Sequence, residues 1–201
     1  GNAGRLTMKY HSAQQHFLRA LKTFRENGDQ FGEASALMGV GNVAYSQNDY
    51  HESDRFYKMA LPISRDIENR KQEADLLTCI GNSAQNQGDY EEAERLLQAS
   101  LVIARELGDR ESEGFSIGGL AFIKENNHDD FAGAERLWRE MLAIRRELDS
   151  PSDIAYSLIE LGRIVSLRGD ANESRQLWIE GVQIRRELGI PIDQWFIDNG
   201  Y

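Results

Sequence analysis

The chain has 201 residues and a formal net charge of −10, from 23 Lys and Arg against 33 Asp and Glu. This acidic balance argues against nucleic acid and anionic membranes as partners, because both are bound by clusters of basic side chains. The sequence contains 40% hydrophobic residues but no apolar run of membrane-spanning length and no secretory signal, so we expect a cytoplasmic protein.

The first expected helix covers residues 9–27, and we interpret residues 1–8 as a tag remnant or a disordered N-terminus. Four units of two helices each follow, at about residues 30–67, 70–107, 110–148 and 152–188. The leading helix fits the second half of an earlier unit, so we expect the sequence to be a fragment of a longer protein. Pro191 ends the pattern, and residues 190–201 form either a tail that caps the last helix or the start of a further helix.

The units repeat one another at a spacing of about 40 residues, as Gly41 and Gly81 or Asp49 and Asp89 illustrate. Within each unit, apolar residues recur at helical spacing on both sides of a short turn. A single pair of helices cannot bury its own apolar face, so neighbouring pairs must stack. The sequence therefore predicts an all-α solenoid of antiparallel helix pairs, with about four repeats plus a leading half repeat.

Each turn inside a unit ends in an aspartate, namely Asp49, Asp89, Asp130 and Asp170. An Asp carboxylate at this place accepts the free backbone N–H groups of the next helix, so we predict four N-caps. The third unit has one extra residue before its cap, since Ala121 to Asp130 is nine steps where Gly81 to Asp89 is eight. We expect the least regular turn there.

Small and large residues alternate between the two helices of a unit, as interlocking helices require. The small residues are Gly41, Gly81, Ala121 and Gly162, and the large ones are Tyr57, Leu97, Trp138 and Trp178. We interpret the large residues as packing residues. Cys79, the single cysteine, is interpreted in the same way, since it has no partner for an internal disulfide.

These motifs resemble the tetratricopeptide repeat (TPR) family over roughly residues 9–189. The resemblance is carried by Val40-Gly41 and Ile80-Gly81 in the first helices, Asp49-Tyr50 and Asp89-Tyr90 in the turns, and Ala93 with Leu97 and Ala134 with Trp138 in the second helices. It implies a right-handed superhelix and disfavours armadillo and HEAT repeats. The family's usual Pro is replaced by Arg65, Arg105, Arg146 and Arg186, which lets the second helix run on. This longer repeat is similar to Leu-Gly-Asn-repeat scaffolds and to sensor arms of bacterial signalling ATPases.

The resemblance also implies a ligand-binding groove on the first helix of each unit, called helix A. The residues at the matching positions are Asn42, Tyr45, Ser46, Asp75, Asn82, Gln85, Asn86, Phe122, Glu125, Tyr156, Glu160 and Arg163. Asn42 and Asn82 stand out, because an Asn amide can pair with a peptide backbone of any sequence. The charged positions of this groove are three acidic residues and one basic residue, namely Asp75, Glu125, Glu160 and Arg163. This balance indicates a partner segment that is basic or polar, with apolar anchors near Tyr45, Phe122 and Tyr156.

No set of residues predicts catalysis, a metal site or a cofactor. The four His residues are scattered, and no Cys and His cluster has the spacing of metal ligands. Arg145-Arg146-Glu147 and Arg185-Arg186-Glu187 are interpreted as solvated helix ends. We therefore expect a non-enzymatic protein.

Two functions fit these expectations. The first is a protein–protein interaction module that binds a peptide or protein segment on its concave helix-A face. The second is a ligand-sensing regulatory arm of a larger bacterial signalling or transcription-regulator ATPase. A third hypothesis is self-association through exposed ends of the solenoid.

Overall fold

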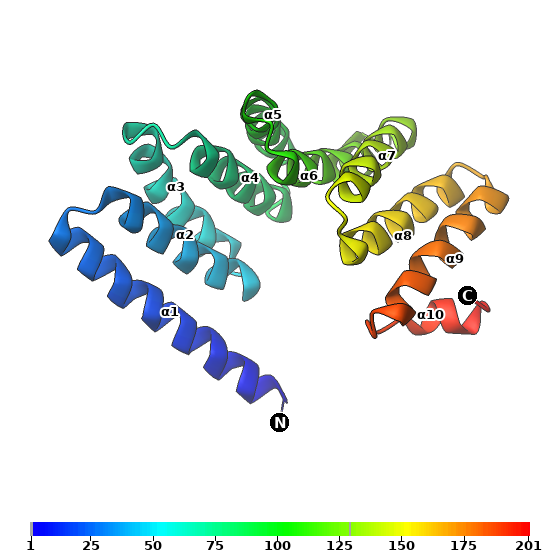
Figure 1. Ribbon diagram of the computed structural model, residues 1–201, viewed down its shortest axis with the longest axis horizontal. Helices are drawn as coiled ribbons and strands as arrows, with labels where there is room; N and C mark the ends of the chain where they lie inside the picture. The colour runs from blue at the N-terminus through cyan, green and yellow to red at the C-terminus, as the bar shows by residue number, and fades with distance from the viewer. Residues whose placement is uncertain (1, 129) are drawn as a thin grey trace. The chain divides into compact units, whose positions relative to one another are not determined.

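The computed structural model describes residues 2–128 and 130–201 and, within them, consists of helices joined by short turns (Figure 1). The helices are α1 (Asn2–Asn27), α2 (Gln30–Ser46), α3 (Tyr50–Asp66), α4 (Arg70–Asn86), α5 (Tyr90–Leu107), α6 (Arg110–His128), α7 (Phe131–Glu147), α8 (Pro151–Leu167), α9 (Ala171–Glu187) and α10 (Gln194–Asp198). The prediction of an all-α protein built from antiparallel helix pairs is confirmed. None of the described helices combines the length and apolarity that crossing a membrane requires.

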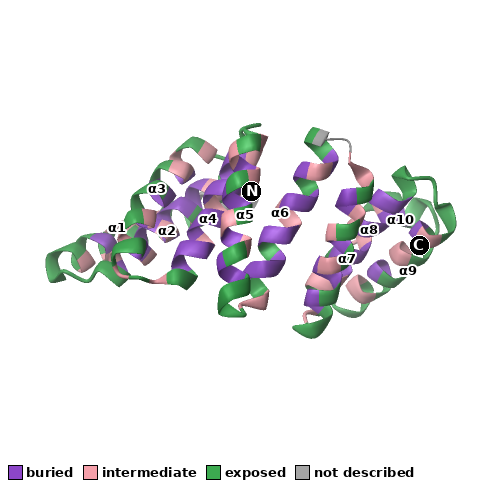
Figure 2. Ribbon diagram, turned by 90° about the horizontal axis from the view of Figure 1, so that it is seen from above, coloured by how far each residue is buried: buried purple, intermediate pink, exposed green. Residues whose placement is uncertain are grey.

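The chain folds as two compact units. Unit 1 ends at Ser112, and unit 2 begins at Glu113. In unit 1 the core is a continuous seam of fully buried side chains from successive helices, among them Leu37, Ala60 and Leu76. In unit 2 the corresponding seam includes Leu158 and Ile164. In Figure 2 the buried stretches of each unit, in purple, lie along helices such as α2, α4 and α8.

All four predicted aspartate caps are present. The side-chain oxygens accept hydrogen bonds from the backbone N–H three residues later, with distances of 3.1 Å at Asp49, 3.3 Å at Asp89, 2.8 Å at Asp130 and 2.9 Å at Asp170. Before the caps at Asp49, Asp89 and Asp170 the chain turns through the left-handed region, with a φ of 62° at Asn48, 83° at Gly88 and 94° at Gly169. Glycine adopts this conformation without the steric cost that a side chain brings.

The third turn is irregular, as predicted. In the other turns the N–H of the capping aspartate donates to the carbonyl five residues earlier, as from Asp49 to Ala44 and from Asp89 to Ala84. At Asp130 the acceptor is Lys124, six residues earlier, and α6 is the longest helix A with 19 residues. The extra residue is therefore absorbed at the end of α6, and the next helix still starts on a capped aspartate.

The predicted pairing of small and large residues is confirmed. A Cβ atom added at Gly41 would lie 2.4 Å from the Tyr57 ring, and one added at Gly162 would lie 2.7 Å from the Trp178 ring. Real Cβ atoms do not come this close to other atoms, so the absence of a side chain is what lets these rings seat against helix A.

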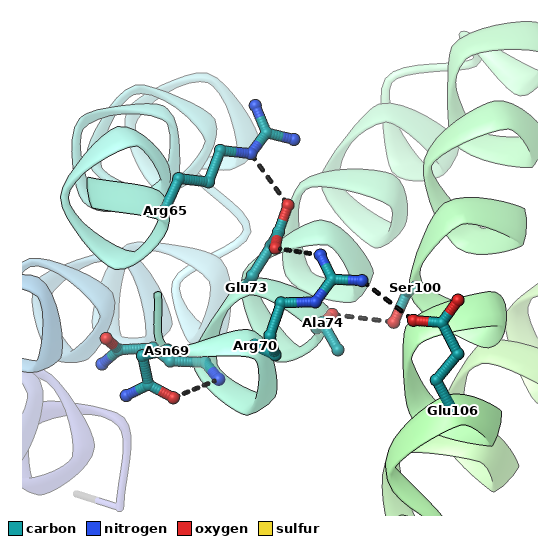
Figure 3. A network of polar contacts seen from close by, with 8 residues as sticks. Arg65, Asn69, Arg70, Glu73, Ala74, Ser100 and Glu106 are labelled. Carbon is teal, nitrogen blue, oxygen red and sulfur yellow. Dashed lines mark hydrogen bonds and ion pairs between the residues drawn. The ribbon is translucent and has the colours of Figure 1, made fainter. Parts of the chain in front are cut away.

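The arginine that replaces the family's proline links neighbouring helices in unit 1 (Figure 3). Nε of Arg65 on α3 donates to Glu73 on α4 at 2.9 Å, and Arg25 on α1 donates to Glu33 on α2 at 2.7 Å. Arg70 extends the network from Glu73 to Glu106 on α5. Arginine at the position of the family's proline therefore has a second effect besides lengthening the helix, because it adds a charged contact between consecutive hairpins.

The interpretation of Arg145 as a solvated residue was wrong. Its side chain is 2% exposed, and its guanidinium lies 4.5 Å from the centre of the Phe115 ring. Counted from its capping aspartate, Arg145 occupies the position of Ala104 and Ser64 in the first two repeats, which are also fully buried. Its nearest carboxylate is Asp153, at 3.7 Å.

The two ends of the chain also differ from the sequence-based boundaries. The first helix begins at Asn2, where the sequence placed its start near residue 9. Between residues 190 and 201 the chain forms α10, whose Phe196 is buried. The rings of Trp195, Phe196 and Tyr201 pack around Trp178 at centroid distances of 5.1, 6.0 and 5.5 Å.

Candidate functional site

The predicted groove residues of unit 1 lie on α2 and α4, on the side of these helices that the core leaves open. Asn42 and Ser46 are exposed on α2, and Asn86 is exposed on α4. Tyr45 and Asn82 are half-buried between them. This side of each helix is polar, since apolar residues such as Val40 and Ala44 lie on the other side and are buried in the core.

Asn42 is held by its own hairpin. Oδ1 of Asn42 accepts a hydrogen bond from the Tyr57 hydroxyl at 2.8 Å, and Tyr57 is 1% exposed. Burial raises the pKa of Tyr57 far above its ordinary value, so the phenol stays protonated and remains a donor. With Oδ1 engaged, the amide N–H groups of Asn42 are the part that can bind a carbonyl oxygen of a ligand.

A second contact joins α2 to α4. Nδ2 of Asn86 donates to the Tyr45 hydroxyl at 2.9 Å and to the backbone oxygen of Asn82 at 2.8 Å. The Tyr45 ring also meets the edge of Tyr50 at 5.3 Å. The structure therefore brings Tyr45, Asn82 and Asn86 together as one fixed polar patch.

Two further predicted residues of unit 1 face inward. Oδ1 of Asp75 accepts a hydrogen bond from the Ser112 hydroxyl at 2.8 Å, so this carboxylate also stabilises the contact between α4 and the start of α6. Gln85 is half-buried, and its Oε1 is a buried acceptor without a hydrogen-bond partner in the part of the chain that the structure describes.

Cys79 also lies on α4. Burial raises the pKa of its thiol to about 12, which favours the interpretation of Cys79 as a packing residue.

In unit 2 the predicted charged residues form one bridged group. The Arg163 guanidinium on α8 binds the Glu125 carboxylate on α6 through both Nη atoms, with Nη2 at 2.7 Å, and its Nε donates to Glu160 at 2.9 Å. The hydrogen bond to Glu125 raises the pKa of Arg163 above its ordinary value. Two carboxylates against one guanidinium leave this group with a net negative charge.

Two predicted apolar anchors of unit 2 are partly open to solvent. Phe122 is 39% exposed and Tyr156 is 45% exposed. The Tyr156 ring is supported by the edge of Trp138 at 5.9 Å. Large aromatic surface that is held in place but not covered is typical of positions that bind a partner.

A cavity of about 500 Å³ lies next to Tyr156, Glu160 and Arg163, between α8, α9 and α10. Its wall also includes Ser166, which the resemblance places in the same groove, and residues that the sequence analysis did not assign to a site, namely Ile159, Leu167, Trp178, Arg185, Asp193, Trp195 and Phe196. Trp178 was interpreted as a packing residue only. The aromatic cluster at residues 195–197 was the available signal, but the sequence does not place it against α8.

The described residues contain no group of three or more His, Cys, Asp and Glu side chains arranged to hold a metal ion. The site thus offers polar amides in unit 1, and a bridged charge group with an aromatic cavity in unit 2. These are groups for recognition by hydrogen bonds and apolar contact.

Comparisons with known proteins agree with this architecture. A family model described as tetratricopeptide repeat matches residues 74–108 and 154–188. A comparison with curated proteins found no match. Among solved structures, BtubC (BKLC) from P. vanneervenii matches with a TM-score of 0.77 at 18% identity, over 92% of this chain and 76% of that one.

Two larger proteins contain a similar fold. A Rap protein in complex with Competence and Sporulation Factor gives a TM-score of 0.80 at 18% identity, and this chain spans 51% of its length. A signal transduction ATPase with a TPR sensor from Pyrococcus horikoshii gives 0.68 at 16% identity, and this chain spans 28% of it. At these identities the likeness establishes the fold, and the family model identifies tetratricopeptide repeats at residues 74–108 and 154–188.

Proposed function

We propose that this chain is a non-enzymatic protein–protein interaction module that binds a peptide or protein segment on its helix-A faces. The observation that carries the proposal is the polar patch of unit 1, where Asn42, Tyr45 and Asn86 are exposed or half-buried and held by hydrogen bonds from their own fold. Because these side chains are already ordered, a ligand that binds them meets a smaller entropy cost.

The charge of the faces favours a basic or polar segment. The chain carries a net charge of −10, and the group of Glu125, Glu160 and Arg163 is negative overall. The exposed rings of Phe122 and Tyr156 supply places for apolar anchors. We propose that the protein meets this partner in the cytoplasm.

The test is a double variant, Asn42→Ala with Asn82→Ala. Binding is measured by fluorescence anisotropy against a library of labelled peptides that combine Lys, Arg, Asn and Gln with one aromatic residue, and against charge-reversed copies. The double variant is expected to lose binding by roughly tenfold or more, because two hydrogen-bonding amides are removed.

The matched control replaces two exposed glutamines on the second helices, Gln98→Ala with Gln176→Ala, and is expected to bind like the parent protein. Circular dichroism establishes that both double variants are folded. Unchanged affinity in the folded Asn42 and Asn82 variant would refute the assignment of the helix-A face.

A ligand-sensing regulatory arm of a larger bacterial signalling or transcription-regulator ATPase is the second candidate. It is favoured by the likeness to the TPR sensor of the P. horikoshii ATPase and by the cavity in unit 2. A nucleotide-binding domain encoded next to this segment, with ATP hydrolysis that responds to a ligand of the segment, would establish it. Self-association is tested by measuring molecular mass at several protein concentrations.

A further inference from the structure

The cavity of unit 2 has a rigid aromatic wall. Trp178 is fixed because its ring seats against Gly162 and its indole N–H donates to the carbonyl of Ile159 at 3.1 Å. Trp195 and Phe196 meet Trp178 and each other edge to face, with centroids 5.0 to 6.0 Å apart. Edge-to-face pairs of this kind hold the rings in a defined geometry.

This wall is nevertheless incompletely covered. Trp195 is 47% exposed, and Leu167, which also lines the cavity, is 56% exposed. The reason lies in the lengths of the helices. Because α10 has five residues and α8 has 17, α10 covers only part of α8. A volume of about 500 Å³ is within the usual range for small-molecule pockets.

The charges of the lining are not all paired. Glu160 and Arg163 are bonded to each other within the bridged group described above. Among the described residues, the Arg185 guanidinium makes one hydrogen bond, a 3.3 Å contact from Nη1 to the carbonyl of Pro191. In the same part of the chain, the Asp193 carboxylate accepts a single hydrogen bond, from the backbone N–H of Trp195 at 2.8 Å.

Within the described residues, neither Arg185 nor Asp193 lies in an ion pair. The same cavity therefore presents one guanidinium and one carboxylate that retain capacity for charged partners, beside a surface of indole and phenyl rings. A ligand with only one charge would leave the other group of the lining without a partner. A ligand that carries a carboxylate, an ammonium group and an apolar side chain satisfies all three features.

We propose that the cavity binds a free α-amino acid with an aromatic or large aliphatic side chain. Its carboxylate accepts hydrogen bonds from Arg185, its ammonium group donates to Asp193, and its side chain packs against Trp178 and Trp195. Arg suits this role because its planar fork of donors matches a carboxylate. The site is separate from the polar patch of unit 1, so it stands whether or not that patch binds a peptide.

The experiment uses four probes with the same side chain that carry both charges, one or neither: L-phenylalanine, N-acetyl-L-phenylalanine, L-phenylalaninamide and N-acetyl-L-phenylalaninamide. Binding is followed by tryptophan fluorescence, since two of the three Trp residues line the cavity, and by calorimetry. For a ligand of about 12 non-hydrogen atoms we expect a Kd of roughly 0.1–1 mM for L-phenylalanine. Each probe that lacks one charge is expected to bind roughly tenfold more weakly.

Two variants assign the charges. Arg185→Gln should weaken L-phenylalanine and N-acetyl-L-phenylalanine about tenfold while leaving the two amides unchanged. Asp193→Asn should weaken the two probes with a free amine, and asparagine preserves the N-cap of α10. Arg136→Gln, which removes an exposed charge on α7 outside the cavity, is the matched control and should change nothing.

Three outcomes would overturn the proposal. They are no binding of L-phenylalanine at about 10 mM, equal affinity for all four probes, and equal affinity for L-phenylalanine and its N-acetyl form. The last result would mean that only a carboxylate is recognised, as in the end of a peptide chain. The Asn42 and Asn82 double variant should bind L-phenylalanine normally, so failure of the peptide-binding proposal is measured independently.

Discussion

Replacing Gly41 by alanine should destabilise the protein, although alanine is the better helix former. The substitution alone favours the helix by about 1 kcal/mol. The added Cβ, however, would lie 2.4 Å from Cε1 and 2.6 Å from Cδ1 of Tyr57. The ring is 1% exposed and cannot swing into solvent, so it or α2 must move.

The cost of this movement exceeds the gain in helix propensity. Overpacking a well-filled contact costs about 1–3 kcal/mol, and a displaced Tyr57 also gives up its hydrogen bond to Asn42, which contributes about 0.5–1.5 kcal/mol. After the gain of about 1 kcal/mol is subtracted, the net loss is about 0.5–3.5 kcal/mol. The polar patch should suffer too, because Asn42 loses the donor that orients it.

Thermal and urea unfolding of Gly41→Ala measure the effect, with Gly118→Ala as control. A Cβ at Gly118 would meet the sulfur of Met141 at 3.0 Å, the flexible end of a side chain that can move aside. This control should be neutral or slightly more stable than the parent. Combining Gly41→Ala with Tyr57→Leu should restore part of the loss. Leucine is the residue type that faces the equivalent glycine in the next hairpin, where Leu97 lies against Gly81. A Gly41→Ala variant that is more stable than the parent would refute the reasoning.

Three further predictions concern single residues. Arg145→Met should change the unfolding free energy by no more than about 1 kcal/mol, since methionine keeps the packing beside Phe115 and removes a buried unpaired Nε. Arg145→Ala, in contrast, should lower the unfolding free energy by about 2–4 kcal/mol. Equal losses in the two variants would mean that the charge itself is needed. Glu68→Gly should stabilise the protein by about 0.5–1 kcal/mol, measured by thermal unfolding, because Glu68 has a φ of 55°. Burial alone would raise the pKa of Asp109, but the hydrogen bond from Lys71 helps to lower it. Asp109 therefore stabilises the fold above about pH 4, and its contribution is lost as pH falls through its lowered pKa. Lys71→Met should be less stable by about 0.5 kcal/mol at pH 7 in urea unfolding, and the difference should shrink as pH falls through the lowered pKa of Asp109.

The fold was predictable because its determinants are local. An aspartate at a turn needs only the next three residues to act as a cap, so Asp49 and Asp89 could be assigned from the chain alone. The contact of Gly162 with Trp178 was equally accessible, because the repeat fixes which residues of the two helices face each other. Because the caps and the small–large pairs recur in each repeat, every copy supports the same assignment of the fold.

Predictions failed where a residue's environment depends on register or on a distant element. Arg145 looks solvated beside Arg146, but it lies at the helix position that Ser64 and Ala104 occupy in the first two repeats, and that position is buried against the next helix pair. The partner of Arg65 was missed for a related reason, since Glu73 belongs to the next hairpin. The groove residues themselves remain a prediction, of which the structure shows the positions and contacts.

The two parts of the candidate site follow different physical rules. In unit 1 the exposed amides are anchored by tyrosine hydroxyls, Asn42 by Tyr57 and Asn86 by Tyr45. In unit 2 the cavity depends on α10, which is too short to complete a helix A and leaves Trp195 half exposed. A repeat that is regular binds extended segments along its length, and a repeat that is interrupted creates an enclosed pocket. Affinity for a peptide and affinity for a small zwitterion should therefore respond to separate substitutions, Asn42→Ala for the first and Arg185→Gln for the second.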